Sequence, residues 1–212
     1  MKLLSITLLS AFITSPIFAQ DMAMPRVADT VQEFMNINGM DMSQFKPSCA
    51  NFEACKKMNY HVMTIKFKGN AQKAFDLLTS LKPNEIWQGT TRFEMEYDPA
   101  SRMFLGKENE LPKISINQIF FLELDITVGM QIPVAFQVVE LNSHKKSLSF
   151  SYLKQNKSNG IQRITFVQDG KNFKIVHETH FKSDSEFRDK YLYGFFHTRL
   201  LDDVWKRFGK RL

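Results

Sequence analysis

The chain has 212 residues, of which 43% are hydrophobic and 24% are charged, and its formal net charge at pH 7 is +6. This composition excludes an intrinsically disordered chain, a collagen and a small disulfide-dense protein, and the length suits one domain. Basic and acidic residues are interspersed along the chain. A nucleic-acid-binding protein usually carries a clustered basic stripe instead, so we expect no nucleic-acid partner.

The first 19 residues have the pattern of a secretory signal. Lys2 provides the positive start, an apolar stretch runs from Leu3 to Phe18, and Ala19 is a small residue suited to cleavage. The stretch is too short, and too often interrupted by Ser, Thr and Pro, for a membrane span. We therefore expect Sec-type export with cleavage after Ala19, and a periplasmic or secreted protein.

Residues 20–58 are predicted to form a leader with a helix and a loop. The helix covers residues 27–38, where apolar residues recur at helical spacing, and Gly39 suits its end. Cys49 and Cys55 are the two cysteines, and an even pair in an exported protein predicts a disulfide. Their C-x5-C spacing is unsuited to zinc. We predict no metal and no other cofactor.

Residues 59–212 are predicted to form the main domain. It opens with a strand around 63–67 and a helix over 71–81, for which Asn70 is a cap and Pro83 a stop. The segment 98–113 is predicted to be a loop. Alternating polar and apolar residues predict further strands around 93–97, 120–128, 132–138, 148–152, 164–166 and 173–181.

The last predicted element is a long amphipathic helix over 183–211, with Ser183 and Glu186 as a capping box. Its apolar residues recur mostly every three or four positions: Phe187, Tyr191, Phe195, Leu201, Val204, Trp205 and Phe208. Strands joined by short turns pair antiparallel, and such a sheet has one dry and one wet face. The prediction is an α+β fold in which a curved antiparallel sheet of about six to seven strands wraps the C-terminal helix, preceded by the N-terminal helix and disulfide loop.

Three stretches carry a resemblance to a known superfamily. Residues 67–78 with Trp87 resemble the opening strand, helix and tryptophan of polyketide cyclase/dehydrase-type proteins, 128–152 resembles their paired middle strands, and 183–211 resembles the closing helix. Over residues 60–212 the chain thus resembles the START-like (SRPBCC) helix-grip superfamily, which includes birch-pollen-allergen-like proteins. The resemblance implies a central cavity, in which members bind lipids, sterols, polyketides or plant hormones and some perform chemistry. The leader, its disulfide and the export signal depart from the usual cytosolic pattern.

The predicted inward positions are rich in Phe and Met, whose flat or flexible side chains adapt to an apolar guest. The alternative is that these side chains simply fill a core, as on any sheet with one apolar face. The candidate ligand-binding residues are Met63, Phe67, Trp87, Phe93, Met95, Phe136, Phe150, Tyr152, Phe173, His177, Tyr191 and Phe195.

The histidines suggest polar functions. His177 and His180 are three apart in a strand and therefore face opposite sides, which argues against joint metal binding. His177 is interpreted as a polar anchor, a general acid or base, or a core histidine with satisfied hydrogen bonds. His197 is expected at a partly exposed helix position. Four acidic residues are predicted to face outward: Glu94, Glu96, Glu123 and Asp125.

The leading functional hypothesis is a non-enzymatic, exported carrier of a hydrophobic, lipid-like small molecule held in the cavity. One alternative is a cyclase- or isomerase-type enzyme that uses His177 with a tyrosine hydroxyl. Another is an extracytoplasmic interaction module that presents the disulfide loop to a protein. The basic segment 206–211 either complements the helix dipole or contacts an anionic membrane surface. The sequence leaves the ligand and the oligomeric state open.

Overall fold

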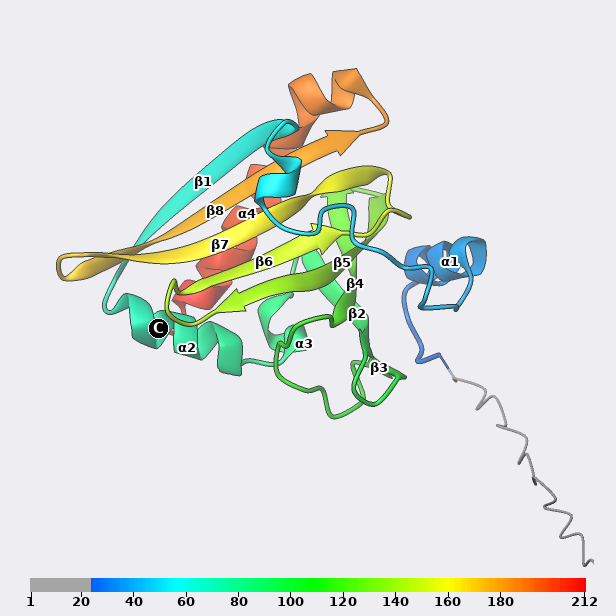
Figure 1. Cartoon of the computed structure of the whole chain (residues 1–212), viewed down its shortest axis with the longest axis horizontal. Helices are drawn as coiled ribbons and strands as arrows, with labels where there is room; N and C mark the ends of the chain where they lie inside the picture. Colours follow the sequence, from blue (N-terminus) through cyan, green and yellow to red (C-terminus); the bar gives the residue numbers. More distant parts are fainter. Residues whose placement is uncertain (1–23) are drawn as a thin grey trace, which may run out of the picture.

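The structure is a computed structural model, and it describes residues 24–212 (Figure 1). The predicted signal at residues 1–19 lies outside the described residues. Every helix within 24–212 is too short or too polar to cross a bilayer. The elements in chain order are α1 (Asp29–Asn38), a 3₁₀ turn (Glu53–Cys55), β1 (Asn59–Lys68), α2 (Ala71–Ser80), α3 (Pro83–Ile86), β2 (Thr91–Asp98), β3 (Met103–Gly106), β4 (Ile119–Thr127), β5 (Met130–Asn142), β6 (Ser147–Tyr152), β7 (Ser158–Asp169), β8 (Asn172–Ser183), a π-helix (Arg188–Leu192) and α4 (Tyr193–Gly209).

The described strands form one antiparallel sheet of eight, in the order β1-β8-β7-β6-β5-β4-β2-β3. The predicted α+β class, with a long C-terminal helix and an N-terminal helix and disulfide loop, is confirmed. The sheet has one strand more than expected because residues 103–106, which were predicted to lie in a loop, pair with β2. This strand is four residues long and lies at the edge of the sheet, where sequence periodicity is weakest.

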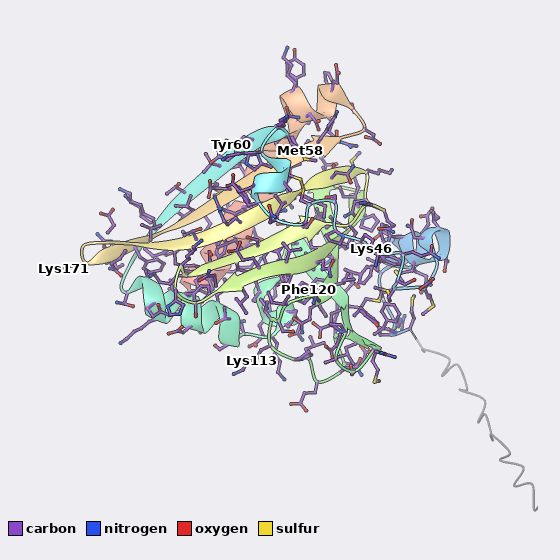
Figure 2. The ribbon with its side chains drawn as sticks, in the orientation of Figure 1. Lys46, Met58, Tyr60, Lys113, Phe120 and Lys171 are labelled. Carbon is purple, nitrogen blue, oxygen red and sulfur yellow. A yellow bond between two sulfur atoms is a disulfide. The ribbon has the colours of Figure 1, made fainter. Side chains whose placement is uncertain are left out.

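The inner face of the sheet is the face that α2, α3 and α4 cover. In Figure 1, α4 lies behind the strands and α2 lies below them. Helix α2 contacts β7 and β8. The main hydrophobic core fills the space between these layers, and Figure 2 labels one of its fully buried members, Phe120, in the middle of the molecule. Helix α2 begins as predicted, because the Asn70 side chain accepts a hydrogen bond from the backbone N–H of Lys73 at 3.0 Å.

The leader covers part of the outer face, which the sequence predicted to be wet. Helix α1 contacts β4 and β5, and its Val31, Phe34 and Met35 join a second hydrophobic cluster with Phe121 of β4. The disulfide loop packs over Ile161 of β7 in a third cluster. In Figure 1 the leader lies on the side of the sheet opposite to α4. The outer face is therefore dry where the leader covers it, and the sheet has core packing on both sides.

The disulfide between Cys49 and Cys55 is present, with Cα atoms 6.0 Å apart. Its loop is tied to the sheet by hydrogen bonds as well as by packing. The backbone N–H of Cys49 donates to the Ser151 hydroxyl at 3.0 Å, and the Ser48 hydroxyl donates to the Gly160 carbonyl at 3.1 Å. Gly160 has a φ of +145°, and a Cβ at this position would collide with the backbone of the adjacent strand β8.

A β-bulge in β2 changes which side chains face the core. The pairing between β2 and β4 shifts between Phe93 and Met95, so that Glu94 is the extra residue. Phe93 lies in the inner core, whereas Met95 belongs to the outer cluster with α1. Because the alternation resumes after the bulge, Glu96 pairs with Phe120 and faces inward. The regular alternation of the sequence predicted the opposite faces for Met95 and Glu96.

The C-terminal helix also begins differently from the prediction. The segment Arg188–Leu192 forms a π-helix, and α4 proper begins at Tyr193. Because a π-turn inserts an extra residue, it rotates the preceding side chains relative to the rest of the helix. Ser183 does not cap the helix as predicted, because its hydroxyl bonds the backbone of Ser185 instead.

Candidate functional site

A cavity of about 80 Å³ lies between the inner face of the sheet and α4. Nineteen of the described residues line it; fourteen of these are apolar, and none of them is Lys, Arg, Asp or Glu. The apolar lining comes from α2, α3, β4, β5, β6, β7 and α4, together with the segment that holds Ile114. Such a site favours an apolar guest, because burial of apolar surface is the main source of binding energy that its walls offer.

Five of the twelve candidate ligand-binding residues line the cavity: Trp87, Phe136, Phe150, Tyr152 and His177. Trp87 directly follows α3, on the connection to β2. Its ring centroid is 4.8 Å from that of Phe120 and 5.6 Å from that of Phe150. Phe136 and Tyr152 face each other across β5 and β6 at 4.6 Å. These aromatic side chains form one wall of the site.

Four other candidates lie on the inner side of the sheet without lining the cavity. Phe93 and Phe173 are buried in the main core. Met63 and Phe67, on the edge strand β1, are half-buried against that core. The Phe67 ring packs closely against the last turn of α4. A Cβ added at Gly209 would lie only 2.5 Å from this ring. For these four residues the structure agrees with the alternative interpretation, in which they fill the core.

The remaining three candidates lie away from the inner core. Met95 faces the outer cluster because of the bulge in β2. Tyr191 is 59% exposed and Phe195 is 67% exposed. Tyr191 lies in the π-helix before α4, and Phe195 lies on another face of α4 than the inward positions. Those inward positions are occupied by His197, Leu201, Val204 and Trp205 instead.

A chain of hydrogen bonds crosses one side of the cavity, and we call its members and His197 the polar end. The Trp205 indole Nε1 donates to His177 Nδ1 at 3.3 Å, and His177 Nε2 lies 2.7 Å from Gln162 Oε1. Because Nδ1 accepts a hydrogen bond, the proton of neutral His177 is on Nε2, and Nε2 donates to the glutamine carbonyl oxygen. Gln162 Nε2 then donates to the Tyr152 hydroxyl at 2.9 Å, which lies 2.7 Å from the Tyr193 hydroxyl.

Burial keeps the polar end uncharged. It lowers the pKa of His177 from the ordinary value of 6.5 to about 3, with His61 a lesser cause. Burial also raises the pKa of Tyr152 to about 12, against the effect of its two hydrogen bonds, and raises that of Tyr193. His177 is therefore a neutral core histidine with both ring nitrogens engaged, which is the third of its predicted interpretations.

His197 lines the cavity without a hydrogen-bond partner within residues 24–212. It lies on α4, is 8% exposed, and lines the cavity, yet neither ring nitrogen has a hydrogen-bond partner among the described residues. Its ring is edge-on to those of His61 and His177, with centroids 5.3 and 5.7 Å away, and is stacked on Tyr193 at 5.0 Å. Burial holds its pKa well below 6.5. The predicted exposed position for His197 is wrong.

His177 and His180 face opposite sides of β8, as predicted. His180 packs on the outer face between Phe52 and Tyr60, with ring centroids 4.7 and 5.1 Å away. In the part of the chain that the structure describes, no three His, Cys, Asp or Glu side chains are placed to hold a metal ion.

The four acidic residues that were predicted to face outward have different environments. Glu94 and Glu123 are buried beneath the leader and bind it: Glu94 accepts from the Ala28 backbone N–H at 2.9 Å, and Glu123 accepts from the Thr30 hydroxyl at 2.7 Å. Arg92 pairs with Glu123 and Asp125. Glu96 is fully buried on the inner face, and within residues 24–212 neither of its oxygens has a hydrogen-bond partner.

The sequence did not single out several residues of the site. Gln162 and Thr91 are single polar residues in predicted strands or next to them, and only the fold shows that they face the cavity. The sequence placed Trp205 on the apolar face of the helix. Only the structure shows that its indole N–H donates a hydrogen bond to His177. The spacing of His197, four residues before Leu201 and eight before Trp205, is a signal that could have placed it on the buried face.

No family model and no curated protein matches the sequence of this chain. Solved structures match its fold. Ginseng major latex-like protein 151 from Panax ginseng is 9% identical, with a TM-score of 0.54 over 73% of this chain and 97% of that protein. Norcoclaurine synthase from Thalictrum flavum, solved with dopamine and hydroxybenzaldehyde, is 10% identical, with a TM-score of 0.54 over 75% of this chain and 88% of that protein.

The KanY protein gives a similar match, with 10% identity and a TM-score of 0.53 over 73% of this chain and 97% of that protein. Identities this low carry the fold and no activity. The three structures cover 73–75% of this chain. This share agrees with the predicted resemblance, which begins near residue 60 and leaves out the leader. The chain therefore has the helix-grip fold, which its resemblance to the START-like (SRPBCC) superfamily implied.

Proposed function

We propose that this protein is an exported binding protein that holds a hydrophobic small molecule in the cavity between the sheet and α4. The observation that carries the proposal is the cavity itself, with its fourteen apolar lining residues and no charged one. The structural neighbour norcoclaurine synthase was solved with two small aromatic compounds, so this fold accommodates small organic ligands in at least one other protein. Binding would be driven by removal of apolar ligand surface from water.

The size of the cavity limits what enters without rearrangement. A volume of 80 Å³ equals the liquid share of about three water molecules, and it is about half of a cavity of about 150 Å³ that binds benzene in another protein. Each buried methylene contributes roughly 0.8 kcal/mol, or about fourfold in affinity. An alcohol of six to eight carbons, or a longer lipid chain, therefore requires that α4 or a neighbouring loop move away from the sheet.

The entrance is best placed beside Trp87 and Leu124. These two are half-buried, whereas the other seventeen lining residues are buried. Trp87 lies on the short connection between α3 and β2, and Leu124 lies near the end of β4. Short connections and strand ends move at lower cost than the centre of the sheet. This segment would open to admit the guest.

Binding is favoured over catalysis by the state of His177. Both of its nitrogens are engaged and its pKa is about 3, so it has no free site to transfer a proton near neutral pH. The interaction-module alternative receives less support, because Cys49, Cys55 and Phe52 are buried against the sheet rather than presented to a partner.

Membrane contact is not part of the proposal. Three of the four cations in the basic segment 206–211 pair with acidic side chains of the same protein: Lys206 with Asp202, Arg207 with Asp203, and Arg211 with Glu85. These pairs favour the helix-terminus interpretation of the segment. Export is supported by the signal-like residues 1–19 and by the disulfide, which persists in an oxidising compartment.

The test uses the full chain, expressed with its own signal in a bacterial host. Both tryptophans of the sequence, Trp87 and Trp205, line the cavity, so intrinsic fluorescence should report occupancy directly. Titration with 1-hexanol, 1-heptanol and 1-octanol should give saturable changes, with affinity rising about fourfold per methylene. Mass spectrometry of the same exported material should find Gln20 at the N-terminus. Fluorescence that does not saturate with any of the three alcohols would contradict the binding proposal.

A further inference from the structure

We infer that the molecule bound in this cavity is uncharged and carries a hydroxyl group that pairs with His197. This inference rests on the proposed function and specifies the chemical class of the ligand. It depends on three features of the site: the absence of charge in the lining, the unpaired imidazole of His197, and the mutual satisfaction of the neighbouring polar groups.

The lining offers no partner for an ionised ligand. None of the nineteen residues is Lys, Arg, Asp or Glu, and both lining histidines, His177 and His197, are neutral in their buried positions. An ion that leaves water for such a site loses its hydration without gaining a counter-charge. A carboxylate or an alkylammonium should therefore be rejected, although its hydrocarbon chain suits the walls.

His197 is the polar group that a ligand would satisfy. A buried donor without a partner costs about 1–3 kcal/mol, and a hydrogen bond from an entering group recovers this cost. The alternative partners at the polar end are already used, because Trp205, His177, Gln162, Tyr152 and Tyr193 bond one another in sequence. His61 is also engaged, since its Nε2 lies 3.0 Å from the Thr198 hydroxyl.

The two ring nitrogens of His197 favour a hydroxyl over a carbonyl. The neutral imidazole has one N–H donor and one nitrogen acceptor, and both lack a hydrogen-bond partner among the described residues. A hydroxyl both donates and accepts, whereas a carbonyl only accepts.

The test compares three probes of equal chain length on the wild-type protein at pH 7, by isothermal titration calorimetry. They are 1-octanol, octanoate and octylammonium, of which the last two are ionised at this pH. We expect 1-octanol to bind at least about 100-fold more tightly than either ion. Octanoate or octylammonium binding as tightly as 1-octanol would overturn the inference and leave the proposed function intact. Failure of all three to bind would overturn both.

The role of His197 is tested with two variants on the same helix. His197→Phe keeps a flat ring and removes the nitrogens, and should weaken 1-octanol binding about threefold to tenfold. Phe195→Ala, on the exposed face two residues earlier, is the matched control and should leave the affinity unchanged. His197→Gln, which restores a donor and an acceptor, should recover part of the loss. Equal 1-octanol affinity in wild type and a folded His197→Phe variant would overturn the assignment of His197.

Discussion

The indole N–H of Trp205 donates to Nδ1 of His177, and this one bond determines the chemistry available to the histidine. With Nδ1 accepting and Nε2 donating to Gln162, the imidazole is held as a single neutral tautomer. Proton uptake by His177 would break the bond from Trp205, because both partners would then be donors. The same contact couples α4 to β8, and hence the covering helix to the sheet.

This arrangement predicts sensitivity to acid. The folded-state pKa of His177 is about 3, whereas the unfolded chain takes up a proton near pH 6.5. Stability from this residue is therefore fully present above pH 6.5 and is lost as the pH falls towards 3, by up to about 4 kcal/mol. We expect His177→Gln to flatten the fall in melting temperature between pH 7 and pH 4.

The control for this experiment is His144→Gln, in the exposed turn between β5 and β6. Its melting temperature should follow the wild-type curve throughout. A His177→Gln profile that runs parallel to the wild-type profile would mean that His177 is not held neutral by the fold.

Glu96 predicts the opposite dependence on pH. Burial, with Asp98 as a lesser cause, raises its pKa from 4.5 to about 8. Between these values the folded chain holds a proton that the unfolded chain has released, so stability is lost as the pH rises from 4.5 to 8. Glu96→Gln should remove this loss and stabilise the protein by up to about 4 kcal/mol at pH 8. Chemical unfolding at pH 5 and pH 8 measures the difference.

Glu94→Gln provides the contrast, because Glu94 is paired with Lys107 and with the Ala28 backbone N–H. That variant should be less stable than wild type at both pH values. If Glu96→Gln were destabilising at pH 8 to the same extent, Glu96 would have to be charged and compensated in the fold.

The leader should contribute to the stability of the sheet. Phe34 of α1 packs against Phe45 and Phe121, with ring centroids 6.5 and 6.2 Å away. Phe34→Ala should cost about 3–5 kcal/mol, because it leaves a cavity in the outer cluster. Phe187→Ala, at a residue that is 63% exposed, should cost less than about 0.5 kcal/mol. Equal stabilities of the two variants in urea unfolding would show that the leader packs loosely.

Removal of the disulfide should weaken the same face. The loop closed by Cys49 and Cys55 is short, and its loss through a Cys49→Ser/Cys55→Ser double variant should cost about 2 kcal/mol. The expected result is a lower urea midpoint with a nearly unchanged slope, since opening so short a loop exposes little additional surface in the unfolded chain. An unchanged midpoint would mean that the hydrogen bonds of Ser48 and Cys49 to the sheet suffice to hold the loop.

The sequence predicted much of the sheet because polar and apolar residues alternate along most of its strands. It predicted the inward positions of Phe136, Phe150 and His177 for this reason. Alternation failed at β2, where the bulge at Glu94 depends on contacts from Ala28 and Lys107, which are distant in sequence. The alternation of residues within one strand gives no information on contacts from other segments of the chain.

Helical periodicity failed in a related way at the start of the last helix. Phe187, Tyr191 and Phe195 follow one another at four-residue intervals, yet all three are exposed. The π-helix that ends at Leu192 puts the first two out of register with α4. Phe195 lies six residues before Leu201, a spacing that puts it on another face of α4. Of the polar end, the sequence analysis singled out His177 and Tyr152 but did not connect them with its other members. The polar end consists of single residues from β6, β7, β8 and α4, and only the packing of α4 on the sheet brings them together.

The central claim, that the cavity accepts an apolar guest, is tested most directly by a crystal structure of the protein grown or soaked with 1-octanol. We expect continuous density for the alkyl chain among Leu122, Phe150 and Trp205, with the hydroxyl within hydrogen-bond distance of His197. Side chains that interlock throughout this region in the presence of saturating 1-octanol, with no density between the sheet and α4, would contradict the account.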